Sequence, residues 1–262
     1  MPDHVLQQLA SLQTQMTGLA SAMEEAESSE AYDIASEKHK GLLQQHKALA
    51  TALEAETEGL VDAMAEVFRQ DFDGMRSLPQ PAAVLPHIYL GGEEEACAVQ
   101  QMMELGIGAV VNCAAEHCMT SPASYPTDWD YIEFQAFDTE LYPLLTNHFE
   151  AFESFTRQAK GKDRKVLVHC VAGANRSAAL CVAYLVNDGV PLMEAVEKVY
   201  TLRPIILSNP GFRRQLVEFA RQCEQKTGLT LLPTADALSE LRERMRIKIG
   251  PKKEFDWSLY IS

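Results

Sequence analysis

Residues 165–186 have the sequence KVLVHCVAGANRSAALCVAYLV. The apolar run over 165–168 predicts a buried strand, and the longer apolar run after Arg176 predicts a helix. Between them lies a loop of small residues that carries a cysteine, Cys170, six positions before Arg176. Strands that alternate with helices are typical of α/β proteins, so this stretch predicts a central, mostly parallel sheet flanked by helices.

The loop has the groups that phosphate chemistry needs. Cys170 would face the unpaired N–H groups and the positive dipole end of the following helix, and Arg176 adds a fixed charge, so both stabilise a thiolate. Gly173 lets the backbone turn tightly toward an oxyanion, which successive loop amides can bind. The planar guanidinium of Arg176 can bind two phosphoryl oxygens. Ser177 is placed to hydrogen-bond the sulfur and help it leave a phosphocysteine.

Each of these residues also has a purely structural interpretation. Cysteine is among the most buried residue types, so Cys170 could be a structural side chain at a strand end. His169 could be a satisfied histidine at the strand terminus, although its position suits tuning of the cysteine. Ser177 could be an ordinary residue of the first helical turn. The structural interpretation leaves Arg176, aimed back at a strand end, unexplained.

On these residues the chain resembles a cysteine-dependent protein phosphatase of the dual-specificity branch, of the atypical type without a rhodanese-like domain. Residues 169–177 match the family's loop, His-Cys-x5-Arg-Ser/Thr, and the resemblance extends from about residue 84 to residue 225. Asn175 is a departure, since a serine is common there, but it removes no catalytic group. The resemblance implies that the phosphoryl group is bound by His169, Val171, Ala172, Gly173, Ala174, Asn175 and Arg176.

The resemblance also assigns segments outside the loop. Residues 85–91 resemble the family's opening strand, 106–115 its second parallel strand, and 134–139 the strand and loop that carry the general acid. Residues 209–212 resemble the segment that opens the last core helix. Asn209 is followed by a proline, which is the pattern of a helix N-cap, and we favour capping over an active-site role.

The reaction needs an acid as well as a nucleophile. An alkoxide or phenolate is a poor leaving group, and a positioned carboxylic acid that protonates it contributes about 10²–10⁴-fold. The resemblance implies Asp138, which precedes a helix expected to begin near Leu144. From the residues alone we would interpret Asp138 as a solvated loop carboxylate. Glu140 is the nearest substitute for it as the acid. The same residue would then act as base when water attacks the phosphocysteine.

Cys113 is a candidate redox partner of Cys170. It ends an apolar run, 109–113, that predicts a parallel strand whose C-terminal end lies on the active-site side of the sheet. Some relatives carry a second cysteine near this place, which forms a disulfide with the nucleophile and shields it from overoxidation. The alternative is a small buried side chain. Cys118 lies nearby, but no second Cys/His pair has zinc-site spacing, so we expect no metal and no cofactor.

Composition restricts the partners and the compartment. The net charge is −14, and residues 1–75 contribute −10 of it, from four basic and 14 acidic side chains (4 − 14). This balance argues against nucleic acid as a partner. No apolar stretch approaches the ~20 residues that span a bilayer, and no signal sequence is recognisable. Six unpatterned cysteines indicate a reducing compartment, the cytoplasm by default with the nucleus as an alternative.

Residues 1–75 are expected to form an N-terminal helical extension. Leucine and methionine residues recur there at three- and four-residue spacing, which predicts a helical hairpin or a coiled-coil segment. Two roles remain open for residues 1–72. They could pack on the catalytic domain as an extra structural layer, or they could join a homodimer or a partner protein.

The catalytic domain is expected over residues 76–228. The proline-rich segment 73–86 predicts an extended linker in front of it. Residues 229–262 are expected to form a C-terminal helical extension, with a helix over 235–249 and an apolar end over 255–261 that docks on the protein or on a partner.

Together these residues predict a two-step hydrolysis of phosphotyrosine and of phosphoserine or phosphothreonine in proteins. Cys170 attacks phosphorus, Asp138 protonates the leaving oxygen, and Arg176 with the loop amides stabilises the transferring group. One alternative is a phosphatase of a non-protein phosphomonoester, although the loop has none of the extra lysines of relatives that act on inositol phosphates. The other is a weakly active phosphate-binding module organised by the N-terminal helices.

Overall fold

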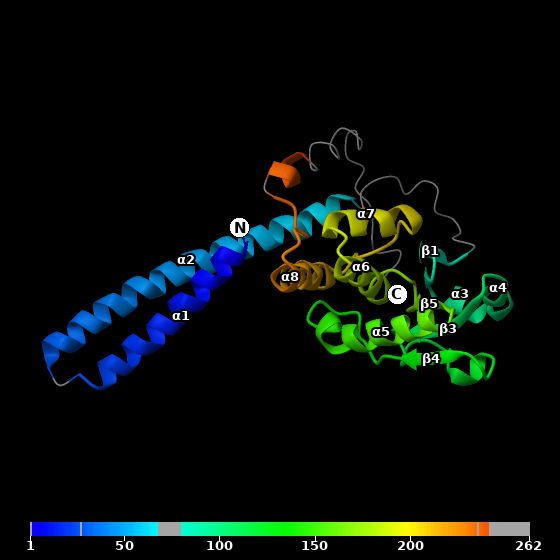
Figure 1. Cartoon of the computed structure of the whole chain (residues 1–262), viewed down its shortest axis with the longest axis horizontal. Coiled ribbons are helices and arrows are strands. Elements are labelled where there is room, and N and C mark those ends of the chain that lie inside the picture. The colour runs from blue at the N-terminus through cyan, green and yellow to red at the C-terminus, as the bar shows by residue number, and fades with distance from the viewer. Residues whose placement is uncertain (1, 27, 68–79, 235, 241–262) are drawn as a thin grey trace. The chain divides into compact units, whose positions relative to one another are not determined.

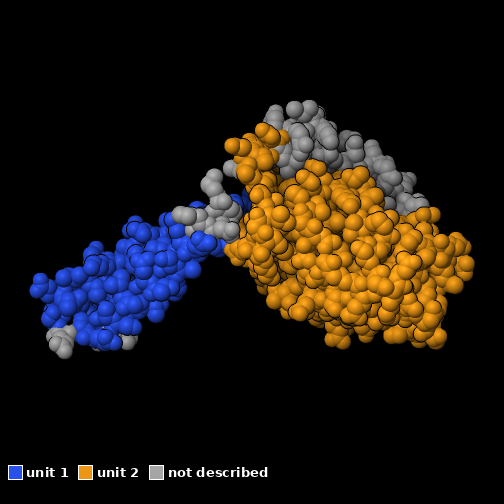
Figure 2. Space-filling view, viewed as in Figure 1, with its two compact units in different colours: residues 1–60 blue, residues 61–262 orange. Residues whose placement is uncertain are grey.

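A computed structural model of the chain describes residues 2–26, 28–67, 80–234 and 236–240. Figure 1 shows the order of its helices and strands. The chain divides into two compact units, Met1–Leu60 and Val61–Ser262, which Figure 2 shows in different colours. Each unit is described by itself below.

The first unit consists of two long helices. α1 (Pro2–Glu24) and most of α2 (Ser29–Val67) lie side by side as a helical hairpin (Figure 1). Apolar residues at three- and four-residue spacing give each helix one apolar face, and Leu12, Met16 and Ala35 are buried. The predicted N-terminal helices are therefore present.

The division between the units falls inside α2. Val61, Ala63 and Met64, near the end of this helix, belong to the second unit and are buried. The boundary expected between residues 75 and 76 lies in the segment 68–79, outside the described residues.

The second unit is built on a five-stranded sheet in the order β1-β2-β5-β3-β4. The first two strands pair antiparallel and all the others pair parallel. β5 lies at the centre, where its Val166, Leu167 and Val168 are buried, as expected of a parallel strand covered on both faces. The strands are β1 (Ala82–Leu85), β2 (Ile88–Gly91), β3 (Ile107–Asn112), β4 (Asp130–Glu133) and β5 (Lys165–His169).

One face of the sheet is covered by two short helices, α3 (Glu93–Cys97) and α4 (Val99–Glu104). Tyr89, Val110 and Leu167 point toward them and form one apolar cluster with their side chains. Side chains alternate along a strand, so the neighbouring positions point to the opposite face. A single 3₁₀ turn, Pro122–Ser124, lies in the loop before β4.

The opposite face is covered by three helices, α5, α6 and α7, and a fourth, α8, packs on α6 (Figure 1). Every residue from Arg176 to Val186 is buried, so α6 is the central helix of this layer. This arrangement confirms the predicted α/β fold with a central, mostly parallel sheet flanked by helices. The helices are α5 (Leu144–Gly161), α6 (Arg176–Asn187), α7 (Leu192–Leu202) and α8 (Pro210–Thr227).

Two strands differ from the prediction. The expected strand over 85–91 is divided into β1 and β2 by a turn at Pro86 and His87, because proline has no N–H to donate to a sheet ladder. The prediction of an extended linker over 73–86 is therefore wrong for residues 82–85, which form β1. The strand expected within 134–139 is also displaced, because β4 ends at Glu133. Of the residues 134–139, only Phe134 continues the pairing with β3, through a hydrogen bond from its N–H to the Asn112 carbonyl at 2.8 Å.

The C-terminal segment is described only in part. Residues 236–240 are helical, within the predicted helix 235–249. The rest of that helix and the apolar end 255–261 lie outside the described residues. None of the described helices combines the length and hydropathy of a membrane-spanning segment.

Candidate active site

The loop between β5 and α6, residues 170–175, is called the cysteine loop here. At its centre Gly173 has a φ of +65°, a region that glycine enters without steric cost. A Cβ at this position would lie 2.4 Å from the carbonyl oxygen of Gly91 in β2, so no larger residue fits. The tight turn expected at Gly173 is therefore present.

The cysteine loop turns its carbonyl oxygens outward. Four successive carbonyls accept from groups outside the loop: Val171 from the Glu93 N–H (2.9 Å), Ala172 and Gly173 from the Arg203 guanidinium (2.9 Å each), and Ala174 from the Leu207 N–H (2.8 Å). In a trans peptide the N–H points opposite to the C=O. The N–H groups of residues 172–175 therefore face the inside of the loop, where they can bind an anion.

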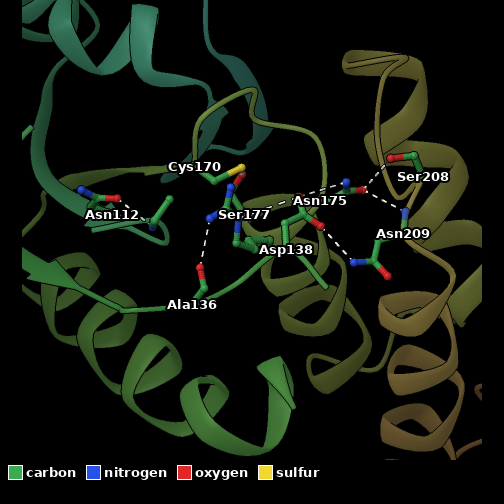
Figure 3. A network of polar contacts seen from close by, with 10 residues as sticks. Asn112, Ala136, Asp138, Cys170, Asn175, Ser177, Ser208 and Asn209 are labelled. Atoms are coloured by element: carbon green, nitrogen blue, oxygen red, sulfur yellow. Dashed lines mark hydrogen bonds and ion pairs between the residues drawn. The ribbon is translucent and has the colours of Figure 1, made fainter. Parts of the chain in front are cut away.

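Cys170 lies at the start of this loop, beside the first turn of α6 (Figure 3). The Ser177 hydroxyl donates a hydrogen bond to Cys170 Sγ at 3.2 Å, and both side chains are buried. A donor aimed at sulfur and the positive end of a helix dipole both favour negative charge on that sulfur. The structure thus brings together the pair that the sequence predicted.

The Arg176 guanidinium is held between the cysteine loop and the chain that leads to Asp138. Its Nη1 donates to the Ala136 carbonyl oxygen at 3.0 Å. Its Nε is buried, lies 3.9 Å from Asp138 Oδ2 and has no hydrogen-bond partner in the described part of the chain. A phosphoryl oxygen bound in the loop would satisfy this donor.

Asp138 lies on the loop between β4 and α5, and its side chain is about one third exposed. Asn175 Nδ2 donates to Asp138 Oδ2 at 3.1 Å, and Asn209 Nδ2 donates to Asp138 Oδ1 at 2.9 Å (Figure 3). The predicted acid therefore lies beside the cysteine loop. The nearest substitute, Glu140, instead pairs with Arg214 at 3.5 Å.

The N-terminus of α8 supports the loop that carries Asp138. Asn209 caps this helix, since its Oδ1 accepts from the Gly211 N–H at 2.9 Å. A Cβ at Gly211 would lie 2.0 Å from the carbonyl oxygen of Glu140, so glycine allows the close approach. The sequence favoured capping over an active-site role for Asn209. In the structure its side chain both caps α8 and donates to Asp138.

His169 ends β5 and is fully buried. Its Nε2 lies 3.4 Å from Thr120 Oγ1. Burial lowers the pKa of His169 to about 4, so the ring is neutral at pH 7. His169 therefore contributes hydrogen bonding and packing next to Cys170, and no positive charge.

Cys113 follows β3 and is buried next to β5, where its N–H donates to the His169 carbonyl at 2.8 Å. Burial, with the neighbouring Cys170 as a second cause, raises the pKa of Cys113 well above its usual value. All six cysteines are free thiols. Among the described residues, no three His, Cys, Asp or Glu side chains are grouped to hold a metal ion.

A buried ion pair that the sequence did not reveal holds the cysteine loop in shape. Arg203 Nη1 donates to Glu95 Oε1 at 2.7 Å, and Glu95 Oε2 accepts from the Gly92 N–H at 2.8 Å. The same guanidinium holds two carbonyls of the cysteine loop. The sequence showed only an arginine at the end of an apolar helix, which does not indicate its partner.

Comparison with known proteins identifies the family to which this site belongs. The family model "Dual specificity phosphatase, catalytic domain" matches residues 88–222. Protein phosphatase Slingshot homolog 3 of Rattus norvegicus is 32% identical over 165 residues, 59% of this chain and 24% of that protein. Dual specificity protein phosphatase 26 of Bos taurus is 32% identical over 163 residues, 61% of this chain and 76% of that protein. The chain thus spans less than a quarter of the rat relative.

Solved structures agree with this comparison. The crystal structure of DUSP15 superimposes with a TM-score of 0.51 at 28% identity, covering 63% of this chain and 96% of that one. The crystal structure of human DUSP28 has a TM-score of 0.51 at 29% identity, covering 55% of this chain and 98% of that one. The match thus covers nearly the whole of the chain in each of these two structures.

Proposed function

The chain belongs to the dual-specificity phosphatase family, and from this premise we propose that it hydrolyses phosphotyrosine and phosphoserine or phosphothreonine in proteins through a phosphocysteine. The observation that carries the proposal is the hydrogen bond from Ser177 to Cys170 Sγ, inside a loop whose N–H groups face inward. It supports a thiolate nucleophile at the base of an oxyanion site.

In the first step the Cys170 thiolate attacks phosphorus and forms the S–P bond while the P–O bond to the substrate breaks. Asp138 gives its proton to the leaving oxygen. The loop N–H groups and the Arg176 guanidinium bind the three peripheral oxygens, on which charge is spread in the transition state.

In the second step a water molecule attacks the phosphocysteine. The Asp138 carboxylate takes a proton from the water, the S–P bond breaks, and phosphate leaves with the oxygen of the water. The Ser177 hydroxyl stabilises the departing Cys170 thiolate through the same 3.2 Å hydrogen bond. Cys170 is then ready for another substrate.

The catalytic thiol supports a reducing compartment, the cytoplasm or the nucleus, because an oxidised cysteine cannot attack phosphorus. For residues 1–72 we propose a role in pairing with a second copy of the chain. Tyr32 and Leu43 of α2 are 47% and 51% exposed. They are 11 residues apart, close to three helical turns, so they lie on one side of the helix.

The test is hydrolysis of an aryl phosphate in the presence of a chelator. Cys170→Ser should abolish turnover, and Asp138→Ala should reduce it by about 10²-fold or more. Cys97→Ser and Asp33→Ala change an exposed thiol and an exposed carboxylate elsewhere and should leave the rate unchanged. Turnover by Cys170→Ser at the wild-type rate would refute the proposal.

The alternatives have their own outcomes in the same assay. Reduced wild type that binds inorganic phosphate without turnover would instead support a binding module. Faster turnover of a phosphoinositide or a 5′-phosphorylated RNA than of phosphotyrosine and phosphothreonine peptides would support a non-protein substrate.

A further inference from the structure

We propose that Asn175 positions the ionised Asp138 for the second step, the hydrolysis of the phosphocysteine. The proposal rests on the reaction proposed above. The side chain of Asn175 would act through Asp138 without touching the reacting atoms, so it has a positioning role, whereas the backbone N–H of Asn175 belongs to the anion-binding loop. The family that the chain resembles commonly has a serine at this position. A serine side chain lacks the amide group, which makes the contacts described next.

The side-chain amide of Asn175 connects three segments of the chain (Figure 3). Its Oδ1 accepts from the Asn209 backbone N–H and from the Ser208 hydroxyl, both at 3.1 Å. Its Nδ2 donates to Asp138 Oδ2 at 3.1 Å. The cysteine loop, the loop that carries Asp138 and the start of α8 therefore meet at one amide.

The orientation of both amides follows from backbone donors. The Asn209 N–H can only donate, so the Asn175 atom facing it must be the oxygen, and the NH₂ group faces Asp138. The Gly211 N–H fixes the Asn209 side chain in the same way, with its NH₂ group toward Asp138. We call the pair of amide donors on Asp138, from Asn175 and Asn209, the amide bridge.

Each oxygen of Asp138 thus accepts a hydrogen bond from an NH₂ group. An ionised carboxylate accepts strongly at both oxygens, whereas the hydroxyl oxygen of a protonated one is a weaker acceptor. The amide bridge therefore fits the form of Asp138 that takes a proton from water in the second step. When Asp138 holds a proton in the first step, the hydrogen bond to its hydroxyl oxygen is weaker.

This assignment predicts that loss of the Asn175 amide slows the second step more than the first. With p-nitrophenyl phosphate the leaving group needs no acid, so kcat/KM reports attack by Cys170 and kcat reports hydrolysis of the phosphocysteine. Asn175→Ser should lower kcat about 10-fold, because small misplacement of a catalytic group costs up to ~10²-fold, and should change kcat/KM less than about threefold.

Rapid mixing provides the direct measurement. In Asn175→Ser the first turnover should release p-nitrophenol in a burst equal to the enzyme concentration, followed by slow turnover. Asn175→Asp keeps the shape of the side chain but presents an oxygen to Asp138, so it should give the same pattern. Asn147→Asp makes the same chemical change at an exposed position of α5 and should behave like wild type. Thermal unfolding of each variant checks that the fold is retained.

A double-mutant cycle with Asp138→Ala decides whether Asn175 acts through Asp138. Once Asp138 is absent, Asn175→Ser should cause no further loss of kcat. Equal losses of kcat and kcat/KM, or full additivity with Asp138→Ala, would overturn the assignment. These outcomes are distinct from failure of the proposed function, which would show as no turnover by wild type or no effect of Asp138→Ala alone.

Discussion

Cys113 takes no part in the proposed hydrolysis, but it lies buried beside β5, the strand that leads into Cys170. We propose that it protects the nucleophile. Peroxide would oxidise the Cys170 thiolate to a sulfenic acid and be reduced to water or hydroxide. Cys113 would then attack the sulfenic sulfur, release a second water and form a disulfide that thiols can reduce.

The prediction for Cys113 concerns recovery after oxidation. Wild type treated with hydrogen peroxide and then with dithiothreitol should regain most of its phosphatase activity. Cys113→Ser should regain much less, because its Cys170 proceeds to the sulfinic acid, which thiols do not reduce. Cys223→Ser, which removes a buried thiol in α8, is the matched control. Equal recovery in all three proteins would contradict the prediction.

Ser177 and Arg176 are positioned by the part of the sequence that directly follows Cys170. Both follow Cys170 within seven residues, and the first turn of α6 places them beside the sulfur and the loop. Asp138, in contrast, depends on Asn175 and Asn209, which come from other elements. The nucleophile is therefore assembled locally, whereas the acid is assembled by packing.

The cysteine loop keeps its shape because α7 ends beside it. Arg203, at the end of that helix, donates to the carbonyls of Ala172 and Gly173 and pairs with Glu95. Lysine has a single ammonium group and cannot reproduce this fork. The ion pair is nearly inaccessible to solvent, so losing one partner leaves an uncompensated buried charge that costs about 3–5 kcal/mol.

Arg203→Lys should therefore weaken oxyanion binding without removing a catalytic group. We expect kcat/KM for an aryl phosphate to fall about 10-fold, and competitive inhibition by inorganic phosphate to weaken by a similar factor, as misplaced anion donors lose their effect. Arg157→Lys is the control, since Arg157 also forks between two carboxylates but lies half-exposed on α5. An unchanged inhibition constant for phosphate would argue against this role of Arg203.

The stability of the whole molecule should depend on pH through histidines that are buried or partly buried. The pKa of His169 is about 4 in the fold against 6.5 in the unfolded chain, so the unfolded state binds more protons between these values. Stability is therefore lost as the pH falls from about 6.5 toward 4. Burial also lowers the pKa of His87 and His148, which adds in the same direction.

Urea unfolding at pH 7 and pH 5 measures this effect. His169 should account for about 2 kcal/mol of the loss between these values, from the 1.4 kcal/mol per pKa unit. His169→Gln is expected to be less stable at pH 7 but to show a smaller loss on going to pH 5. If the variant loses as much as wild type, the titration of His169 does not contribute.

The helical hairpin can be tested by the mass of the full chain in solution. We expect a dimer by light scattering, and a monomer after the double change Tyr32→Ser and Leu43→Ser. Leu229→Ser changes an equally exposed leucine in the second unit and should leave the dimer intact. The charge of −10 on residues 1–75 opposes pairing, so added salt should strengthen the dimer. A monomer at all salt concentrations would instead favour a structural role for the hairpin.

The sequence by itself determined the features that depend on neighbouring residues. The strand, the small-residue loop and the helix over 165–186 follow from local apolar patterns, and Cys170, Arg176 and Ser177 occupy one short stretch. The cap at Asn209 is equally local, because the asparagine bonds an N–H only two residues away. The division of 82–91 into two strands was missed, since β1 is held by its pairing with β2 and not by its own pattern.

Only the tertiary structure decided the contacts that place the acid and hold the loop. Asn175 and Asn209 are 37 and 71 residues from Asp138, and Arg203 is 108 residues from Glu95. Periodicity and motif spacing describe what a segment does by itself and carry no information about which distant polar group it meets. Those partners are set by where the end of α7 and the start of α8 meet the cysteine loop and the loop that carries Asp138, because buried donors and acceptors there must find one another.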